Sequence, residues 1–347
     1  MTLREIHLQQ FRSYTDKRFI FDPGVTVITG PNGSGKTNIL EAIYLMGYGK
    51  SFRDNDETLM GYGKNWWRVA ATVDDTSREL RYETSASIST KTFIFENEKR
   101  GRFTSRYQLP IILFEPDDLL LVHGSPSRRR SYLDALLGRL SPSYATILRR
   151  YERALAQRNK LLKQSVSIDE DTMFIWDIAL AEEATLIVAM RKDFIERANR
   201  VLSNYYSHIA EKEHQLEIRY VSHVHSENYK QSLIHALKSR YDRDQATGFT
   251  SAGPHRDDID FMMDNKDMEL TASRGEIRTL LLSLKRIETD RYRDIFETTP
   301  LFLLDDVFSE LDATRRKHLI DNFYDHQMII TTTNADIVKT KARQIKL

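Results

Sequence analysis

The residues with the clearest chemistry lie near the start of the chain, in the stretch VITGPNGSGKTNILEAI. This stretch has the spacing of a phosphate-binding loop, formed by Gly30, Pro31, Asn32, Gly33, Ser34, Gly35, Lys36 and Thr37. Glycines let backbone N–H groups turn toward phosphate oxygens, Lys36 can reach the β- and γ-phosphates, and the Thr37 hydroxyl can ligate Mg²⁺. The β-branched run Val25–Thr29 predicts a buried strand before the loop, and a helix is expected to begin at Lys36. The stretch therefore predicts a nucleotide-binding site.

A pair of carboxylates follows a second apolar run, PLFLLDD. Residues 301–304 predict a buried strand, which places Asp305 at its carboxyl end, where ligands bind in open parallel sheets. We expect Asp305 to hold Mg²⁺ and Asp306 to orient the attacking water or accept its proton. Asp306 and Lys36 are thus the candidate catalytic residues for phosphate release.

A third candidate precedes that strand, where Ser273 and Gly275 stand before an amphipathic pattern over residues 275–296. A serine and a glycine at the start of a helix can bind an anion through the helix N-terminus. An ordinary capped helix explains the same residues, and taken alone that explanation is the simpler one.

Composition sets the broad class of protein. The chain has 347 residues, enough for two lobes with sizeable cores. Hydrophobic residues make up 40% and charged residues 29%, an ordinary balance for a soluble protein. The absence of cysteine excludes disulfides and thiol catalysis. No apolar run approaches the length needed to cross a bilayer, and the first residues lack the apolar core of a signal peptide, so we expect a cytoplasmic protein with no membrane partner.

Charge is unevenly distributed although the net charge is only +1. Residues 128–163 contain ten Lys or Arg against two acids, Asp134 and Glu152. Such an excess can attract the phosphates of a nucleic acid. A solvated helix face is the alternative explanation.

The periodicity changes twice along the chain. Residues 1–115 read mainly as β-strands around one helix, residues 116–243 are mostly helical, and residues 244–347 return to alternating helices and strands. Strand character is expected at GFTSAG, DIDFMM and residues 327–331, and a further helix at residues 313–324. The pattern predicts an α/β unit, formed by the two ends of the chain, with a helical insertion.

The order of these motifs resembles that of ABC-type ATPase heads, in which a phosphate loop, a serine–glycine helix, LFLLDD and SELD follow one another. More narrowly, the chain is similar to the RecF family of bacterial recombination mediators, which is related to the SMC and Rad50 heads. The stretches that carry the resemblance span nearly the whole chain in family order: FRSY, GPNGSGKTNILEAI, GKSFR, EPDDLLLVHGSPSRRRSYLD, QRNKLLK, TSAGPHRDDIDF, SRGEIRTLLLSLK and LLDDVFSELD.

The resemblance implies a fold and a mechanism. The fold is an ABC-type P-loop ATPase head with a RecA-like core, formed by residues 1–115 and 244–347, and a helical clamp lobe at residues 116–243. ATP, with Mg²⁺, on the phosphate loop of one protomer is contacted by Ser273 and Gly275 of another, so that ATP drives a homodimer. Asp312 lies near the same junction, and Arg12 and Asn334 contribute to the nucleotide site.

The resemblance also implies partners. Gapped DNA, with single- and double-stranded regions, is held without sequence specificity. The candidate phosphate contacts in the basic segment are Arg128, Arg129, Arg130, Arg149, Arg150, Arg158 and Lys160. RecR and RecO are the implied protein partners, in DNA repair, replication, recombination and the SOS response.

The chain departs from the wider superfamily at two positions. Most ABC heads have glutamate where this chain has Asp306, and the shorter side chain predicts slow hydrolysis, as in a timed switch. Asn334 stands near the place where many heads have histidine, and an amide is a poorer base.

Two other functions share part of the pattern. The nucleotide-binding subunit of a membrane transporter has the same head, but it needs a much shorter helical segment than residues 116–243 provide. A small-molecule kinase with a phosphate loop leaves SRGE and SELD unexplained.

Overall fold

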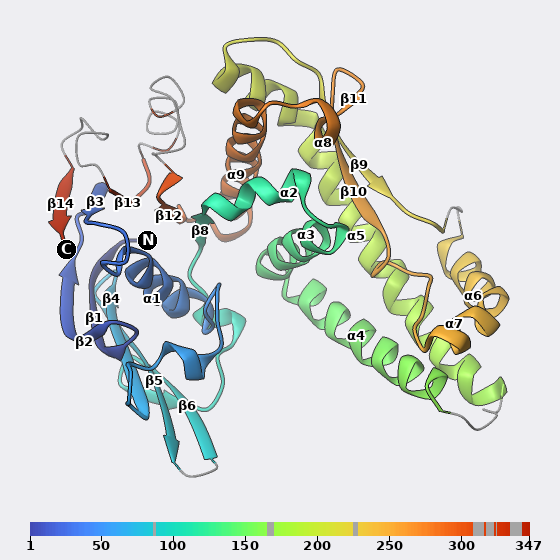
Figure 1. Cartoon of the computed structure of the whole chain (residues 1–347), viewed down its shortest axis with the longest axis horizontal. Helices are drawn as coiled ribbons and strands as arrows, with labels where there is room; N and C mark the ends of the chain where they lie inside the picture. Colours follow the sequence, from blue (N-terminus) through green and yellow to red (C-terminus); the bar gives the residue numbers. More distant parts are fainter. Residues whose placement is uncertain are drawn as a thin grey trace. The chain divides into compact units, whose positions relative to one another are not determined.

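The protein forms two compact units, seen in Figure 1, according to a computed structural model. The structure describes residues 1–85, 88–164, 170–224, 228–307, 316, 323, 325–333 and 342–347. Unit 1 contains Met1–Asp118 and Glu288–Leu347, and unit 2 contains Leu119–Ile287. The α/β unit is therefore discontinuous, with one continuous segment between its two halves.

The expected second boundary, at residues 243 and 244, differs from the observed one. Residues 244–287 are in unit 2 because their strand β10 (Asp258–Met263) pairs with β9 (Leu216–Val221). A buried ion pair between Arg158 and Asp244 connects the same region to the helical segment. The stretch DIDFMM predicted strand β10 but not the strand that pairs with it.

Unit 1 contains two sheets. The antiparallel sheet has the order β2-β1-β4-β5-β6-β7, and the parallel sheet has the order β14-β3-β13-β12-β8. Its antiparallel strands are β1 (Leu3–Phe11), β2 (Tyr14–Ile20), β4 (Trp66–Val73), β5 (Thr76–Ser85), β6 (Ile88–Phe95) and β7 (Glu98–Arg100). Its parallel strands are β3 (Val25–Thr29), β8 (Ile111–Phe114), β12 (Leu301–Asp305), β13 (Met328–Thr332) and β14 (Arg343–Lys346).

Helix α1 (Lys36–Tyr48) connects the two sheets through the core of unit 1. It contacts strands of both sheets, and eleven of its 13 residues are buried. A helix that is apolar nearly all round, as ILEAIYLMGY is, fits such a position between two layers. Gly47 allows close packing, since a Cβ there would lie 2.3 Å from the Ile111 Cδ1 atom. The core therefore fixes the helix that follows the phosphate loop.

Unit 2 combines helices with a three-stranded sheet of order β11-β10-β9. Its remaining elements are α2 (Leu120–His123), α3 (Pro126–Leu140), α4 (Pro142–Leu162), α5 (Glu170–Ala210), α6 (Tyr229–Ser239), α7 (Tyr241–Thr247), β11 (Lys266–Asp267), α8 (Met268–Thr271) and most of α9 (Arg274–Phe296). Helices α4 and α5 run side by side, and β9 packs on α5 (Figure 1). Pro142 at the first position of α4 and the Ser141 side chain, which accepts from the Tyr144 N–H, start that helix as its sequence predicts.

Most predicted elements are confirmed, with three differences. The stretch GFTSAG is a loop rather than a strand, because its backbone bonds to side chains of unit 2. Strands β7, β9, β11 and β14 were not predicted. The predicted helix at residues 313–324 lies largely outside the described residues. In the described part of the chain, no helix is both long and apolar enough to cross a membrane.

Candidate functional site

The phosphate loop leaves strand β3 and ends at the first turn of α1, as the sequence predicts. Gly33 and Gly35 have φ angles of 80° and 99°, a region that favours glycine. A Cβ on Gly35 would also lie 2.7 Å from the Tyr14 hydroxyl oxygen. Both the backbone conformation and the space around Gly35 therefore require glycine, and the loop wraps the N-terminus of α1, where anions bind.

Two polar side chains of the loop fit a bound triphosphate. The Lys36 ammonium is buried and donates to the carbonyls of Gly30, at 2.8 Å, and Pro31, at 2.9 Å. The Ser34 hydroxyl oxygen is buried and has no hydrogen-bond partner among the described residues. A hydroxyl and an ammonium held at the mouth of a glycine loop match the donors that phosphate oxygens need.

Thr37 and Asp305 lie in direct contact at the carboxyl edge of the parallel sheet. The Thr37 hydroxyl is 3.0 and 2.9 Å from the two carboxylate oxygens of Asp305. Both provide hard oxygen ligands of the kind that Mg²⁺ prefers, so the pair fits the metal of a nucleotide. The two residues expected to share a metal are thus brought together.

Thr331, on strand β13, connects the two acids, and sequence reasoning did not assign it. Its hydroxyl donates to Asp305 Oδ1 at 2.7 Å and accepts from the Asp306 N–H at 3.0 Å. Asp306 has a φ of 50°, which turns the chain directly after β12. The signal for Thr331 was its place in a run of three threonines ending the neighbouring strand.

Arg12 is held by carboxylates of unit 1. Its guanidinium donates to both oxygens of the fully buried Glu41, at 2.9 and 2.7 Å, and to Asp54 at 2.5 Å. Hydrogen bonding to Glu41, more than to Asp54, raises the pKa of Arg12 against the lowering effect of burial. Ser51 also donates to Glu41, at 2.6 Å. The described contacts of Arg12 are thus within the protein, and its role toward nucleotide stays a prediction.

The stretches FRSY and GKSFR therefore have a shared structural role. Arg12 and Ser51 both bind Glu41 on α1, while Tyr14 donates to the Gly35 carbonyl at 3.2 Å. The Asn38 amide reaches the Ser13 hydroxyl at 3.1 Å. The β1–β2 turn thus contacts the phosphate loop and the first turn of α1 through Tyr14 and Ser13. The order of the motifs in the sequence did not predict this role.

Ser273 caps helix α9 in unit 2. Its hydroxyl and its N–H both donate to Glu276 Oε2 at 2.7 Å, and the Glu276 N–H lies 3.3 Å from the Ser273 hydroxyl. This is a capping box, and these bonds lower the pKa of Glu276. Ser273 is exposed at the helix start, and Gly275 is in the first turn. The other predicted nucleotide contacts, Asp312 and Asn334, lie outside the described residues.

The candidate DNA contacts divide by burial, and two of them are wrong. Arg129 is 5% exposed and bonds to Asp258, and Arg158 is 0% exposed between Asp177 and Asp244. Their charges are compensated inside unit 2, so they are not available to DNA phosphates. The other candidates are more accessible: Arg128, Arg149, Arg150 and Lys160 are exposed, and Arg130 is half-buried and donates to the Asp257 carbonyl.

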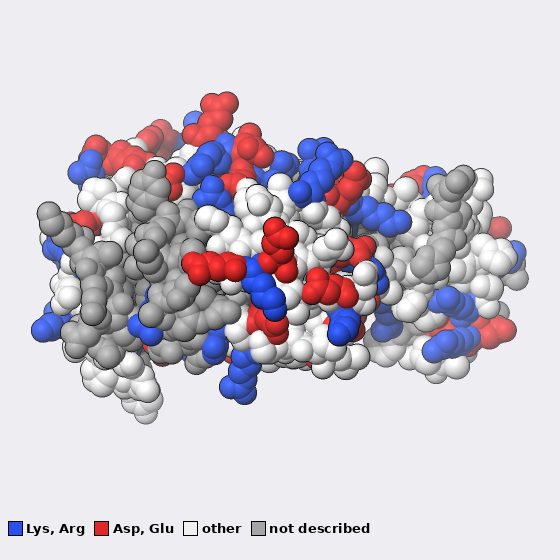
Figure 2. Space-filling model, turned by 90° about the horizontal axis from the view of Figure 1, so that it is seen from above, with Lys and Arg blue, Asp and Glu red and all other residues white. Residues whose placement is uncertain are grey.

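Acidic and basic side chains lie intermingled on the face shown in Figure 2. This mixture agrees with the net charge of +1. On this face, DNA contacts must therefore be sought in local groups of cations.

A phosphate loop between β3 and α1, with Thr37 against Asp305 at the edge of the parallel sheet, defines an ABC-type P-loop ATPase head. Residues 5–217 match the family model described as AAA domain. A DNA replication and repair protein RecF of Ruminiclostridium cellulolyticum is 33% identical over 97% of this chain and 94% of the relative. One of Symbiobacterium thermophilum is 35% identical over 97% and 92%. The chain belongs to the RecF family of DNA replication and repair proteins.

Solved structures agree with this assignment. The structure of the recombination mediator protein RecF-ATPrS in RecFOR pathway matches with a TM-score of 0.89 and 29% identity, covering 100% of this chain and 96% of that one. An Smc head bound to the C-winged helix domain of ScpA matches with a TM-score of 0.52 and 16% identity, covering 96% and 90%, which shows a shared fold.

Proposed function

We propose that this chain is an ATP-dependent DNA-binding recombination mediator. It acts at single-strand gaps and at junctions of single- and double-stranded DNA, in repair, replication and the SOS response. The full-length similarity to DNA replication and repair proteins named RecF supports this function over that of a transporter subunit. The observation that carries the nucleotide part is the contact of Thr37 with both carboxylate oxygens of Asp305.

Different residues of the head bind the phosphates, hold the metal and orient the attacking water. Backbone N–H groups of the loop, Lys36 and the Ser34 hydroxyl bind the phosphates. Thr37 and Asp305 hold Mg²⁺, which neutralises charge on the transferred phosphoryl group. Asp306 orients the attacking water and accepts its proton. A RecF structure with ATP supports ATP as the nucleotide for this chain.

ATP joins two copies of the chain. The exposed Ser273 and the half-buried Gly275 of one protomer contact the nucleotide on the phosphate loop of its partner, which makes ATP part of the interface. Binding energy then favours the dimer, and hydrolysis releases it. The short side chain of Asp306 makes hydrolysis slow, so the dimer persists long enough to mark a site on DNA.

DNA, RecR and RecO are the proposed partners. The exposed Arg128, Arg149, Arg150 and Lys160, with Arg130, provide phosphate contacts in unit 2. The RecFOR pathway named for the solved RecF structures supports RecR and RecO. A protein that uses DNA and ATP in this way works in the cytoplasm.

The decisive experiment measures molecular mass in solution, with and without ATP and a gapped duplex, for the wild type and for Asp306→Asn. We expect a dimer with ATP and a longer-lived dimer for Asp306→Asn, because an amide cannot accept the proton. An Asp306→Asn protein that stayed monomeric at saturating ATP would refute the ATP-driven dimer.

A further inference from the structure

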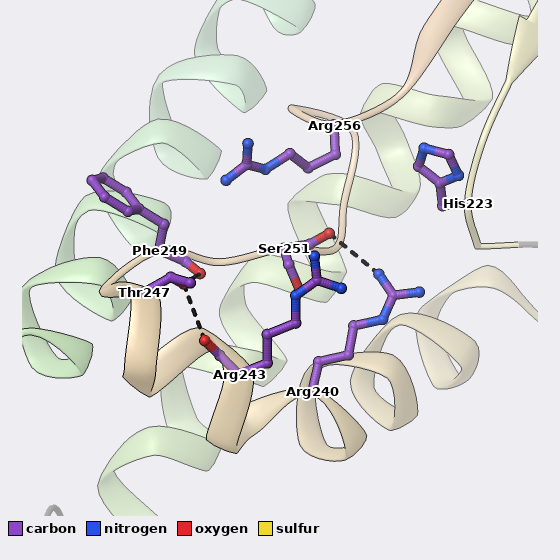
Figure 3. Close-up of a pocket in the computed structure, with 7 residues that line it drawn as sticks. All are labelled: His223, Arg240, Arg243, Thr247, Phe249, Ser251 and Arg256. Carbon is purple, nitrogen blue, oxygen red and sulfur yellow. Dashed lines mark hydrogen bonds between the residues drawn. The ribbon is translucent and has the colours of Figure 1, made fainter.

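Unit 2 contains a pocket of about 670 Å³ that none of the predicted site residues lines. It lies between the α6–α7 turn and the loop of residues 248–256 (Figure 3). Its lining consists of His223, Arg240, Arg243, Thr247, Phe249, Ser251 and Arg256. Three arginines and a histidine face this space, and none of the described lining residues is acidic.

Among the described residues, no carboxylate pairs with the three arginines of the pocket. Arg243 is exposed, and among the described residues its guanidinium makes no hydrogen bond and no ion pair. Within the described part of the chain, Arg240 donates only to a backbone carbonyl, that of Ser251, at 3.2 Å. Arg256 donates to the Thr250 carbonyl at 3.1 and 3.0 Å. A carbonyl carries no net charge, so all three arginines keep their full attraction for an anion.

An unused donor lies in the same pocket. The Ser251 hydroxyl oxygen is buried and has no hydrogen-bond partner among the described residues. A buried hydroxyl without a partner is costly, and a bound ligand atom would satisfy it. Figure 3 shows Ser251 beside Arg240 and Arg243.

The loop that carries Ser251 and Arg256 is anchored by buried polar groups. The Thr250 hydroxyl binds Arg158 at 2.9 Å and the Asn159 amide oxygen at 2.8 Å. At the other end of the loop, the Tyr151 hydroxyl lies 2.5 Å from His255 Nδ1. The fixed backbone holds Ser251 and Arg256 in place before any ligand arrives, which lowers the entropic cost of binding.

An aromatic ring and a further cation complete the rim. Phe249 is 49% exposed, and the Lys163 ammonium lies 4.3 Å from the centroid of its ring. An exposed ring next to arginines can contact a base or sugar while the guanidinium groups hold phosphate. An acidic peptide would use the cations but has no need of the ring.

We propose that this pocket binds phosphate groups of a DNA strand, with Arg240, Arg243 and Arg256 as the phosphate contacts. The inference deepens the proposed function and rests on its DNA-binding part. It assigns these contacts to a preformed pocket, in addition to the exposed cations of α3 and α4. Guanidinium groups suit phosphate because their donors form a planar fork.

The test uses Arg243, because its side chain stabilises no described part of the fold. We compare Arg243→Ala and Arg243→Lys with the wild type for binding of a gapped duplex by the full-length protein with ATP, over a range of salt concentrations. The matched control is Arg197→Ala, since Arg197 is an exposed arginine paired with Asp193 on its own helix. We expect roughly tenfold weaker binding for Arg243→Ala, with a salt slope lower by about one. Arg243→Lys should keep the slope, and the control should stay within about twofold.

The outcomes separate this inference from the proposed function. A wild type that binds no DNA would refute both. A wild type that binds DNA while Arg243→Ala binds it equally well, with the same salt slope, would refute the pocket alone. The same holds if Arg243→Ala loses only binding to RecR, or only a weak affinity for inorganic phosphate measured by calorimetry, while DNA binding is unchanged.

Discussion

The Thr37 hydroxyl contacts both carboxylate oxygens of Asp305, at 3.0 and 2.9 Å, although the two residues are 268 positions apart in the chain. Parallel pairing between β13 and its neighbours β3 and β12 places the start of α1 and the end of β12 at the same sheet edge. A hydroxyl and a carboxylate in contact can both turn toward one cation.

Thr37→Ala should weaken the part of ATP binding that depends on Mg²⁺. The hydroxyl is one of two protein ligands proposed for the metal, and loss of a bond to a charged group costs about 1.5–3 kcal/mol. ATP titrations with Mg²⁺ and with EDTA measure this part as a difference. Thr37→Ser keeps the hydroxyl and serves as the control. Equal Mg²⁺ dependence in Thr37→Ala and the wild type would contradict the assignment.

Gly35→Ala should abolish ATP binding and lower stability. At φ 99° a Cβ is strained, by roughly 1–2 kcal/mol for a left-handed residue, and it would also meet the Tyr14 hydroxyl at 2.7 Å. Gly24 provides a control outside the loop, because a Cβ there has no neighbour within 4 Å. Thermal unfolding and ATP titration of both variants test the difference. Wild-type affinity in Gly35→Ala would show that the loop can adopt another shape.

Mixing Lys36→Ala with Ser273→Ala should restore part of the activity that each lacks alone. In a symmetric composite site, one of the two sites of a mixed dimer has an intact loop and an intact serine. ATP hydrolysis by mixtures at several ratios measures the recovery. Ser273→Ala also loses the capping box, at a cost of about 1 kcal/mol, so its unfolding is checked separately. If no ratio restores activity, Ser273 does not act on the partner's nucleotide.

Arg158→Ala should destabilise unit 2 by about 3–5 kcal/mol, because it leaves Asp177 and Asp244 as uncompensated buried charges. Lys160→Ala, at an exposed position of the same helix, should change the free energy of unfolding by at most about 0.5 kcal/mol. Urea unfolding compares the two. A small effect of Arg158→Ala would show that its buried contacts with Asp177 and Asp244 add little to the stability of unit 2.

Stability should fall as the pH drops through the range in which His255 titrates. Burial lowers the pKa of His255 to about 4, whereas the unfolded chain takes up that proton near pH 6.5. The unfolded state therefore binds more protons between these values, which makes stability rise with pH there by up to about 1.4 kcal/mol per pH unit. His255→Gln should have a shallower slope in urea unfolding between pH 4.5 and pH 7. An unchanged slope would assign the titration to other groups.

The sequence predicted the elements of the head well because their signals are local. The strand Val25–Thr29, the start of α1 at Lys36 and the position of Asp305 each depend on a few adjacent residues, and all are confirmed. The role of each of these residues toward ATP stays a prediction. Local patterns also gave the helices of unit 2, where proline and serine mark the N-termini of α3 and α4.

Contacts between distant residues could not be predicted in the same way. The basic segment contains Arg128, Arg129 and Arg130 in a row, yet only Arg129 is buried, because Asp258 on β10 faces it. The partner is more than a hundred residues away, so composition cannot reveal it. The pocket arginines are equally hidden, since Arg240, Arg243 and Arg256 come from a turn, a helix and a loop.

The strand order of the parallel sheet determines when unit 1 can fold during synthesis on the ribosome. Strand β3, which carries the phosphate loop, is paired on one side with β13 and on the other with β14. Both neighbours follow unit 2 in the sequence, and unit 2 is one uninterrupted stretch. A nascent chain can therefore complete unit 2 first, whereas its ATP cradle matures only after residue 346 has left the exit tunnel.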